Sequence, residues 1–363
     1  MKSLSRMMDF KILSEELVEV IKKYRHILIA IKGSPDPDVV AASFVFKLIC
    51  EAYDTQASID SPVHPSLPQN RKIIKDLNLP ICFDEFKDIK AQYDAYAVFD
   101  HQSVDIDGIT GVIPCAVHID HHDRVDEEIQ VDFKLIVDDA GSTSTVLAFL
   151  MEELKSELKP GKALQMKIAT ALEYGLCTDT NNLQYATSMD RQALEIISPF
   201  SDKVLLRKIG SLHFSKQAMG FLNQALSHHI VYKDWLICGI GFMDEKYRDS
   251  IAIIGDFLLK REDITTVVVF SIIEKKAGLT LDASFRTRKE NFNLNALIKR
   301  ITREGGGRKF KGAFQVNLDY FANCPDKERL WDVVYLTTIE ALKKQRDQYR
   351  VGFLKDLWRK IFD

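Results

Sequence analysis

The sequence predicts an α/β protein of two domains: an N-terminal domain with a mostly parallel sheet, and a smaller C-terminal α/β domain, with a cleft between them. Short apolar strands alternate with helix-like segments over the first 200 residues, which is typical of a parallel sheet covered by helices. The alternation weakens between 201 and 215 and then restarts. A chain of 363 residues, 46% of them hydrophobic, is long enough to build two cores.

The spacing of apolar residues places the elements of the first domain, residues 1–200. Continuous apolar runs such as "HILIAI" predict strands buried on both faces. We expect strands at 26–31, 56–60, 94–100 and 114–120 and helices at 9–24, 38–53, 68–79 and, in several pieces, 141–200. Ser or Thr near 142–143 is a suitable N-cap for the helical segment that follows.

After a predicted linker at 201–215, the second domain, residues 216–325, repeats the alternation. We expect helices at 215–229, 248–262 and 294–302, strands at 234–242, 264–274 and 278–286, and a glycine run at 305–307. The pattern of apolar and charged residues at 326–363 predicts amphipathic C-terminal helices. Packing on their own domain is favoured over docking on a partner or a membrane surface.

Composition restricts the cellular context and the partners. The net charge of −3 excludes a globally basic nucleic-acid coat, although a local basic groove is compatible with it. Six cysteines without a CxxC pair predict reduced thiols rather than a zinc knuckle or a disulfide scaffold. Because the N-terminus lacks a signal-peptide core and no apolar run is long enough to span a bilayer, we expect a cytoplasmic protein with no membrane partner.

Acidic residues follow four apolar elements in turn. The segments are "KGSPDPD" with Asp36 and Asp38, "VFD" with Asp100, "HIDHH" with Asp120, His121 and His122, and "GLCTDTNNL" with Asp179. Because ligands bind beyond the carboxyl ends of parallel strands, we expect these side chains to converge. Converging carboxylates repel each other, so a cation must lie among them, and Asp with His and no nearby Cys suits Mn²⁺ or Mg²⁺.

Each segment taken alone has a simpler interpretation. "DHH" is compatible with a turn at a strand end that exposes its histidines, and "PDPD" with a turn whose Asp caps the next helix. Asp100 or Asp179 taken alone would not indicate a functional site. Their joint occurrence in this order, each after an apolar element, favours a site.

With these four segments, most of the chain resembles the DHH phosphoesterase superfamily. That superfamily includes RecJ-like exonucleases, nano-RNases that also cleave pAp, cyclic-di-AMP phosphodiesterases, family II pyrophosphatases and some exopolyphosphatases. The second domain is similar to the DHH-associated domain, since "ASFRTR" at 283–288 and "GGGRKFKGAF" at 305–314 match its Arg-Ser and glycine-rich elements. The resemblance implies a catalytic metal-binding domain at 1–200 and a substrate-binding domain at 216–325.

The resemblance also implies a role for each matching residue. The metal ligands would be Asp36, Asp38, Asp100, His121 and Asp179, with Asp100 bridging to a second ion that Asp36 partly holds. The catalytic residues would be His122, which faces the scissile phosphate, and Asp120, which orients the histidines. Arg286 and the loop Gly305, Gly306, Gly307 would bind the distal phosphate or nucleotide, since Arg and glycine N–H groups suit oxyanions.

Two positions depart from the family pattern. Lys32 stands where the first motif usually has a metal-binding His. Its ammonium cannot bind a cation but can neutralise Asp36 and Asp100 in place of the second ion, which would make Lys32 a third catalytic residue. The alternatives are that Lys32 points elsewhere and the second ion binds weakly, or that the site is not catalytic.

Arg308 is the second departure, because it replaces a His of the family pattern and makes the glycine run more basic. The added charge favours a phosphate-rich substrate, although a solvated loop is the alternative.

The resulting hypothesis is a Mn²⁺- or Mg²⁺-dependent phosphoesterase with one or two ions per chain. Its substrates would be small nucleotides or very short oligonucleotides of the pAp, nanoRNA or linear or cyclic dinucleotide type, held in the cleft. The alternatives are an exopolyphosphatase and a nucleotide or phosphate sensor that does not catalyse. The net charge disfavours long duplex DNA, and the resemblance is compatible with a homodimer.

Overall fold

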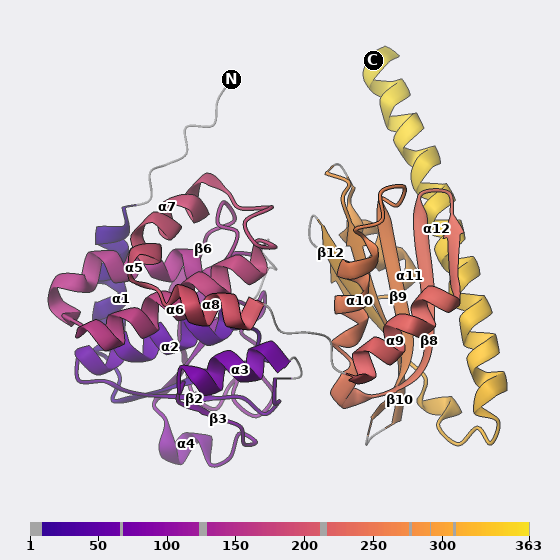
Figure 1. The fold of residues 1–363 in the computed structure, drawn as a ribbon. Helices are drawn as coiled ribbons and strands as arrows, with labels where there is room; N and C mark the ends of the chain where they lie inside the picture. The colour runs from indigo at the N-terminus through magenta and orange to yellow at the C-terminus, as the bar shows by residue number, and fades with distance from the viewer. Residues whose placement is uncertain are drawn as a thin grey trace. The chain divides into compact units, whose positions relative to one another are not determined.

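A computed structural model of the chain describes residues 9–65, 68–122, 129–210, 216–275, 278–290, 292–307 and 310–362, the last of them, 349–362, as backbone alone. The chain divides into two compact units, Met1–Leu212 and His213–Asp363. Figure 1 shows the elements of each unit. The cleft that the sequence predicts between the units stays a prediction.

The first unit contains a six-stranded sheet in which every neighbouring pair of strands is parallel. The strand order is β3-β2-β1-β4-β5-β6. The strands are β1 His26–Ala30, β2 Gln56–Asp60, β3 Ile81–Cys82, β4 Ala95–Phe99, β5 Cys115–Asp120 and β6 Val131–Ile136. The four expected strands are present. Two strands were not predicted from the sequence: β3, which has two residues, and β6, which alternates polar and apolar residues instead of forming an apolar run.

Helices surround this sheet (Figure 1). They are α1 Phe10–Ile21, α2 Pro37–Ala52, α3 Pro68–Asp76, α4 Ile89–Gln92, α5 Thr143–Leu158, α6 Lys162–Asp179, α7 Ser188–Ile197, η1 Ser198–Phe200 and α8 Lys203–Gly210. Ser142 is the N-cap of α5, as predicted. The segment predicted as a linker contains α8, whose Ile209 packs against Ile73 and Tyr174; 211–215 lie outside the described residues.

Strand β1 lies at the point where the strand order reverses, because β2 and β3 follow on one side of it and β4 to β6 on the other. Its residues alternate between two cores: Ile27 and Ile29 pack with α1, α2 and α5, whereas Leu28 and Ala30 pack with α4 and the segment after β4. In an open parallel sheet, the carboxyl ends of the strands at such a reversal form the usual ligand crevice. The acidic segments after β1, β4 and β5 are at this edge.

The second unit has a mixed six-stranded sheet of order β11-β12-β10-β9-β8-β7. Only β8 and β9 pair in parallel among its described strands. The elements are α9 Lys216–Ser227, β7 His229–Tyr232, β8 Trp235–Asp244, η2 Glu245–Tyr247, α10 Ser250–Leu258, β9 Thr266–Lys275, β10 Gly278–Thr287, α11 Leu294–Ile301, β11 Gly305–Gly307, β12 Lys311–Asn317, η3 Asp319–Phe321 and α12 Lys327–Phe362. Strands β7 and β12 were not predicted from the sequence, and the residues of β11 were expected to form a loop.

The C-terminal segment is one long helix, α12 (Figure 1). Leu330, Val334 and Leu342 are buried in the core of the second unit, so α12 packs on its own domain, as favoured from the sequence. Arg346, only 8% exposed, donates to Asp234 between β7 and β8. No helix among the described residues combines the length and the apolarity needed to cross a membrane.

Candidate metal centre

Asp36 and Asp38 lie at the start of α2 and have different partners. Asp36 is the N-cap, and its carboxylate accepts from the N–H groups of Asp38 and Val39 at 3.0 Å each. Asp38 is fully buried. Its two oxygens accept from the N–H groups of Thr143 and Ser144 at 2.7 Å each, in the first turn of α5. The helix cap and the candidate ligand are therefore separate residues of the same motif.

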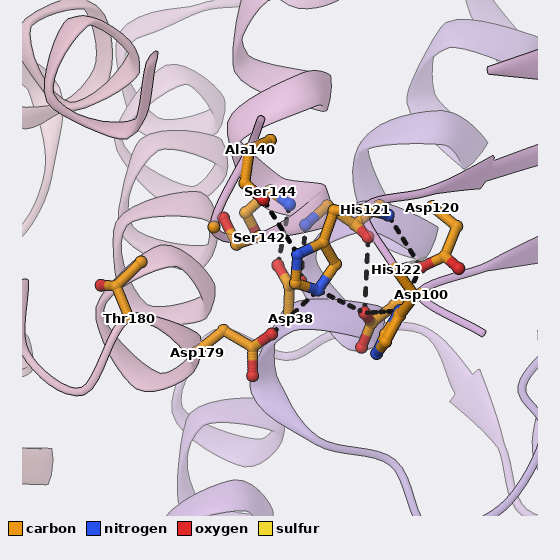
Figure 2. A network of polar contacts seen from close by, with 12 residues as sticks. Asp38, Asp100, Asp120, His121, His122, Ala140, Ser142, Ser144, Asp179 and Thr180 are labelled. Carbon is orange, nitrogen blue, oxygen red and sulfur yellow. Dashed lines mark hydrogen bonds and ion pairs between the residues drawn. The ribbon is translucent and has the colours of Figure 1, made fainter. Parts of the chain in front are cut away.

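His121 joins the remaining acidic segments (Figure 2). Its Nε2 lies 3.2 Å from an oxygen of Asp100, which follows β4, and 3.0 Å from an oxygen of Asp179, the last residue of α6. Its Nδ1 lies 3.2 Å from the carbonyl oxygen of Ala140. A ring that donates from Nδ1 to a backbone carbonyl presents Nε2 to the acids, which is the usual arrangement of a metal-binding histidine.

Backbone geometry around the site is constrained at two residues. Asp100 has a left-handed φ of +51°, a conformation that costs energy for residues other than glycine and collects at functional sites. Gly175 in α6 has no side chain because a Cβ there would lie 2.3 Å from Ser144 Oγ and 3.0 Å from Asp38 Cα. The missing Cβ lets α6, α2 and the start of α5 meet closely enough to bring their ligand atoms together.

Burial and repulsion change the proton affinities of this cluster. Burial, together with the charge of Asp179, raises the pKa of Asp38 to about 7. Burial and the charges of Asp36 and Asp38 raise the pKa of Asp100 well above its usual range. Burial alone would lower the pKa of His121, but hydrogen bonds to Asp100 and Asp179 outweigh it and raise the pKa. The cluster therefore needs positive charge, which protons or a cation can supply.

The donor set fits a divalent cation. Asp38, Asp100, His121 and Asp179 each offer a ligand atom, and these four atoms lie within 4.8 Å of one another. Three carboxylates and one imidazole are the oxygen-rich donors that Mn²⁺ and Mg²⁺ prefer. Four of the five predicted ligands are thus brought together, while Asp36 caps α2 beside them.

Asp120 and His122 form a pair next to this cluster. Asp120, at the end of β5, accepts from the N–H of His121 at 2.8 Å and lies 2.5 Å from Nδ1 of His122. Burial alone would raise the pKa of Asp120, but the hydrogen bond with His122 outweighs it and lowers the pKa. This arrangement is the one expected if Asp120 orients the histidines. Nε2 of His118 lies 2.8 Å from the carbonyl oxygen of His101, and His118 is not among the candidate ligands.

Lys32 extends toward the loop after β4. Its Nζ donates to the carbonyl oxygen of Asp105 at 2.6 Å. Burial, together with the Lys32 charge, lowers the pKa of His101, the residue after Asp100. The ammonium is therefore held by this loop, and the role of Lys32 stays a prediction.

The predicted substrate-binding residues lie in the second unit. Arg286 on β10 donates through Nε to Asp256 at 2.6 Å and through its terminal nitrogen to Ser284 Oγ at 2.9 Å. Gly305–Gly307 form strand β11, paired with β12, which corrects the expectation of a loop. A Cβ on Gly307 would lie 3.0 Å from Leu294, so this glycine allows α11 to approach β11. Arg308 lies outside the described residues.

Four residues that position the candidate ligands were not predicted from the sequence. These are Ala140, Thr143, Ser144 and Gly175. One signal was available for Gly175, because a glycine inside a helical pattern lowers helix stability and usually has a packing reason. The amides that hold Asp38 left no signal, since every residue except proline has an N–H group.

Comparisons with known proteins agree with this fold. Residues 26–176 match the DHH family, N-terminal domain. An uncharacterized protein of Methanocaldococcus jannaschii is 27% identical over 320 residues, which cover 86% of this chain. The chain spans 62% of the length of that relative.

Two solved structures are similar at low sequence identity. An exopolyphosphatase-related protein from Bacteroides fragilis has a TM-score of 0.70 at 16% identity, with 97% of this chain and 100% of that chain covered. RecJ in complex with Mn²⁺ from Thermus thermophilus has a TM-score of 0.49 at 10% identity, with 92% of this chain and 55% of that chain covered. The first similarity shows a shared two-domain α/β fold; the second is too distant to add to it.

Proposed function

On the premise that residues 26–176 belong to the DHH family, N-terminal domain, we propose that the chain is a phosphoesterase that depends on a divalent cation. It hydrolyses phosphodiester or phosphomonoester bonds of small nucleotides or very short oligonucleotides. The observation that carries this proposal is the convergence of Asp38, Asp100, His121 and Asp179 within 4.8 Å at the carboxyl edge of a parallel sheet.

Each residue of the centre has a distinct task in this proposal. A divalent cation in such a site supplies activation of water and stabilisation of charge on phosphoryl oxygens. Asp38 is held by two backbone amides and His121 by the Ala140 carbonyl, so both keep one orientation. Asp120 holds the ring of His122, which contacts the phosphate and donates a proton to the leaving oxygen.

The substrate class follows from charge and from the second unit. The net charge of −3 disfavours binding along long duplex DNA, whose affinity depends on many cationic contacts. Arg286 is the described candidate for a terminal phosphate, although its guanidinium also pairs with Asp256. We therefore propose a ligand bound by its end, such as pAp, a linear or cyclic dinucleotide, or an RNA of a few nucleotides; polyphosphate is the enzymatic alternative.

A sensor that binds the same ligands without hydrolysing them is the second candidate. It is supported by Lys32, which replaces a ligand of the family motif and is anchored on Asp105. With one ligand position lost, the site would hold a single ion and bind phosphate without turnover.

Turnover assays decide between these functions. Purified chain with Mn²⁺ or Mg²⁺ is incubated with pAp, short RNAs, linear and cyclic dinucleotides and polyphosphate, and the products are separated by ion-exchange chromatography. The Asp100→Asn variant serves as the control, because Asn tolerates the left-handed φ of this position. Hydrolysis by the wild type alone supports the phosphoesterase, and cation-dependent binding of a ligand without products supports the sensor. If neither binding nor hydrolysis occurs, both proposals are wrong.

A further inference from the structure

Asp190 is a fully buried carboxylate that the predicted site does not include. It lies in the first turn of α7. Its oxygens accept from the N–H of Gly141 at 2.9 Å, the hydroxyl of Thr145 at 2.6 Å and the N–H of Thr187 at 2.7 Å. Burying a carboxylate is costly, so the contacts that it makes point to a specific task.

One of these contacts fixes Asp190 itself. The N–H of Asp190 donates to the hydroxyl of Thr187 at 3.2 Å, and the N–H of Thr187 donates back to the Asp190 carboxylate. This reciprocal pair is a capping box at the start of α7. Contacts at the start of its own helix therefore hold the Asp190 carboxylate in one orientation, independently of its contacts with other elements.

The other two contacts hold the entry segment of α5, defined here as residues 140–145. Gly141 N–H and Thr145 Oγ1 both donate to Oδ1 of Asp190, so one oxygen binds the segment at two points. A Cβ on Gly141 would lie 2.3 Å from the other oxygen of Asp190 and 2.8 Å from the methyl group of Thr180. Only glycine fits at this position without movement of its neighbours.

The entry segment reaches three candidate ligands (Figure 2). The carbonyl of Ala140 lies against Nδ1 of His121. The amides of Thr143 and Ser144 hold Asp38. The hydroxyl of Thr143 donates to an oxygen of Asp100 at 3.4 Å. A Cβ on Gly141 would also meet Thr180, the neighbour of the fourth ligand, Asp179.

We propose that Asp190 is a positioning residue of the metal centre: by clamping the entry segment of α5, it sets the places of His121, Asp38 and Asp100 without contacting the ion. This inference rests on the proposed function, because it requires that the cluster binds a cation. Loss of an outer partner of this kind typically lowers metal affinity about 10–100-fold.

The test compares two Asp→Asn variants in the full-length chain. Asp190→Asn keeps the shape of the side chain and removes one acceptor. Asp202→Asn is the matched control, because Asp202 accepts from the N–H groups of Val204 and Leu205 at the start of α8 in the same unit and contacts none of the candidate ligands. Mn²⁺ affinity is measured by isothermal titration calorimetry and by the spectrum of bound Mn²⁺ in electron paramagnetic resonance, and melting temperature is measured in chelator.

The expected result is a Kd for Mn²⁺ raised about 10–100-fold in Asp190→Asn, with a changed spectrum, and an unchanged Kd in Asp202→Asn. Thr145→Val provides a second variant if Asp190→Asn does not fold, since it removes the hydroxyl that donates to Asp190 and keeps the volume. Wild-type Mn²⁺ affinity in both Asp190→Asn and Thr145→Val, or in Thr145→Val alone if Asp190→Asn does not fold, overturns this inference and leaves the proposed function standing. A wild-type chain that binds neither Mn²⁺ nor Mg²⁺ overturns the proposed function and this inference together.

Discussion

Gly175→Ala tests whether close packing of three helices sets the geometry of the metal centre. The added Cβ would lie 2.3 Å from Ser144 Oγ, 3.0 Å from Asp38 Cα and 3.1 Å from Asp38 Oδ1. The hydroxyl of Ser144 can rotate away. The Asp38 backbone cannot, so α6 or α2 must shift.

Two opposing effects determine the stability of this variant. Forcing an extra methyl group into a packed interior costs about 1–3 kcal/mol. Replacing glycine by alanine inside a helix stabilises it by about 1 kcal/mol. The net loss is about 1 kcal/mol, which lowers the melting temperature of a domain of about 200 residues by roughly 2–4 °C. Because Asp38 moves with the backbone, the Kd for Mn²⁺ should rise about tenfold or more.

Thermal unfolding in chelator and calorimetric titration with Mn²⁺ measure the two effects separately. Gly220→Ala is the matched control, since Gly220 lies inside α9 and a Cβ there meets nothing within 4 Å. This control should gain up to about 1 kcal/mol and leave Mn²⁺ affinity unchanged. The double variant Ser144→Ala with Gly175→Ala should lose as much as Gly175→Ala, because the Ser144 hydroxyl can rotate away and the contact with the Asp38 backbone remains.

A folded Gly175→Ala protein with wild-type Mn²⁺ affinity would refute the reasoning, because the shift of Asp38 would then not matter to the ion. A double variant that recovers the stability and the Mn²⁺ affinity of the wild type would show that the Ser144 contact, rather than the Asp38 backbone, is the origin of the loss.

Three further predictions concern other parts of the chain. Lys32→His should raise the Mn²⁺ stoichiometry toward two ions per chain by calorimetry, and unchanged stoichiometry would show that this position is not a ligand site. Asp100→Asn should abolish Mn²⁺ binding and hydrolysis together; hydrolysis that survives would contradict the assignment of the cluster. Burial alone would raise the pKa of Asp234, but hydrogen bonds from Lys289, Thr265 and Arg346 hold it well below its usual range. Its stabilisation, about 2 kcal/mol for hydrogen bonds to a charged group, is fully present above the unfolded pKa of about 3.9 and is lost as pH falls through the folded pKa. In urea unfolding, the difference in free energy of unfolding between the wild type and Asp234→Asn should therefore be largest at neutral pH and become smaller in acid. A difference that does not change with pH would refute this prediction.

Apolar runs and the acids that follow them were sufficient to predict four of the six strands of the first sheet and the neighbourhood of its site. Residues 26–31 and 94–100 contain strands because both faces of a parallel sheet are buried, which leaves a continuous apolar signal. Asp38, Asp100 and Asp120 lie close together because parallel strands end at the same edge. Both regularities depend on local sequence, so they can be recognised without a structure.

The second unit shows where local sequence is insufficient. The glycine run at 305–307 has the composition of a loop, but its backbone pairs with β12 across Gly312, Ala313 and Phe314. Strand pairing depends on hydrogen bonds to another segment, and the identity of the side chains says little about it. Strand β6 was missed for a different reason: its alternating polar and apolar residues are a local strand signal, but they do not form the continuous apolar run on which the other strands were predicted.

By itself, the sequence determined the α/β fold, the edge of the sheet at which the acids gather and the resemblance of residues 26–176 to the DHH family, N-terminal domain. Only the tertiary structure decided which atoms meet: Lys32 on the Asp105 carbonyl, the amides of the α5 entry segment on Asp38, and Asp190 clamping that segment. The physical reason is separation along the chain. Asp38 and Thr143 are 105 residues apart, and a contact of this kind depends on how helices pack rather than on any periodicity near either residue.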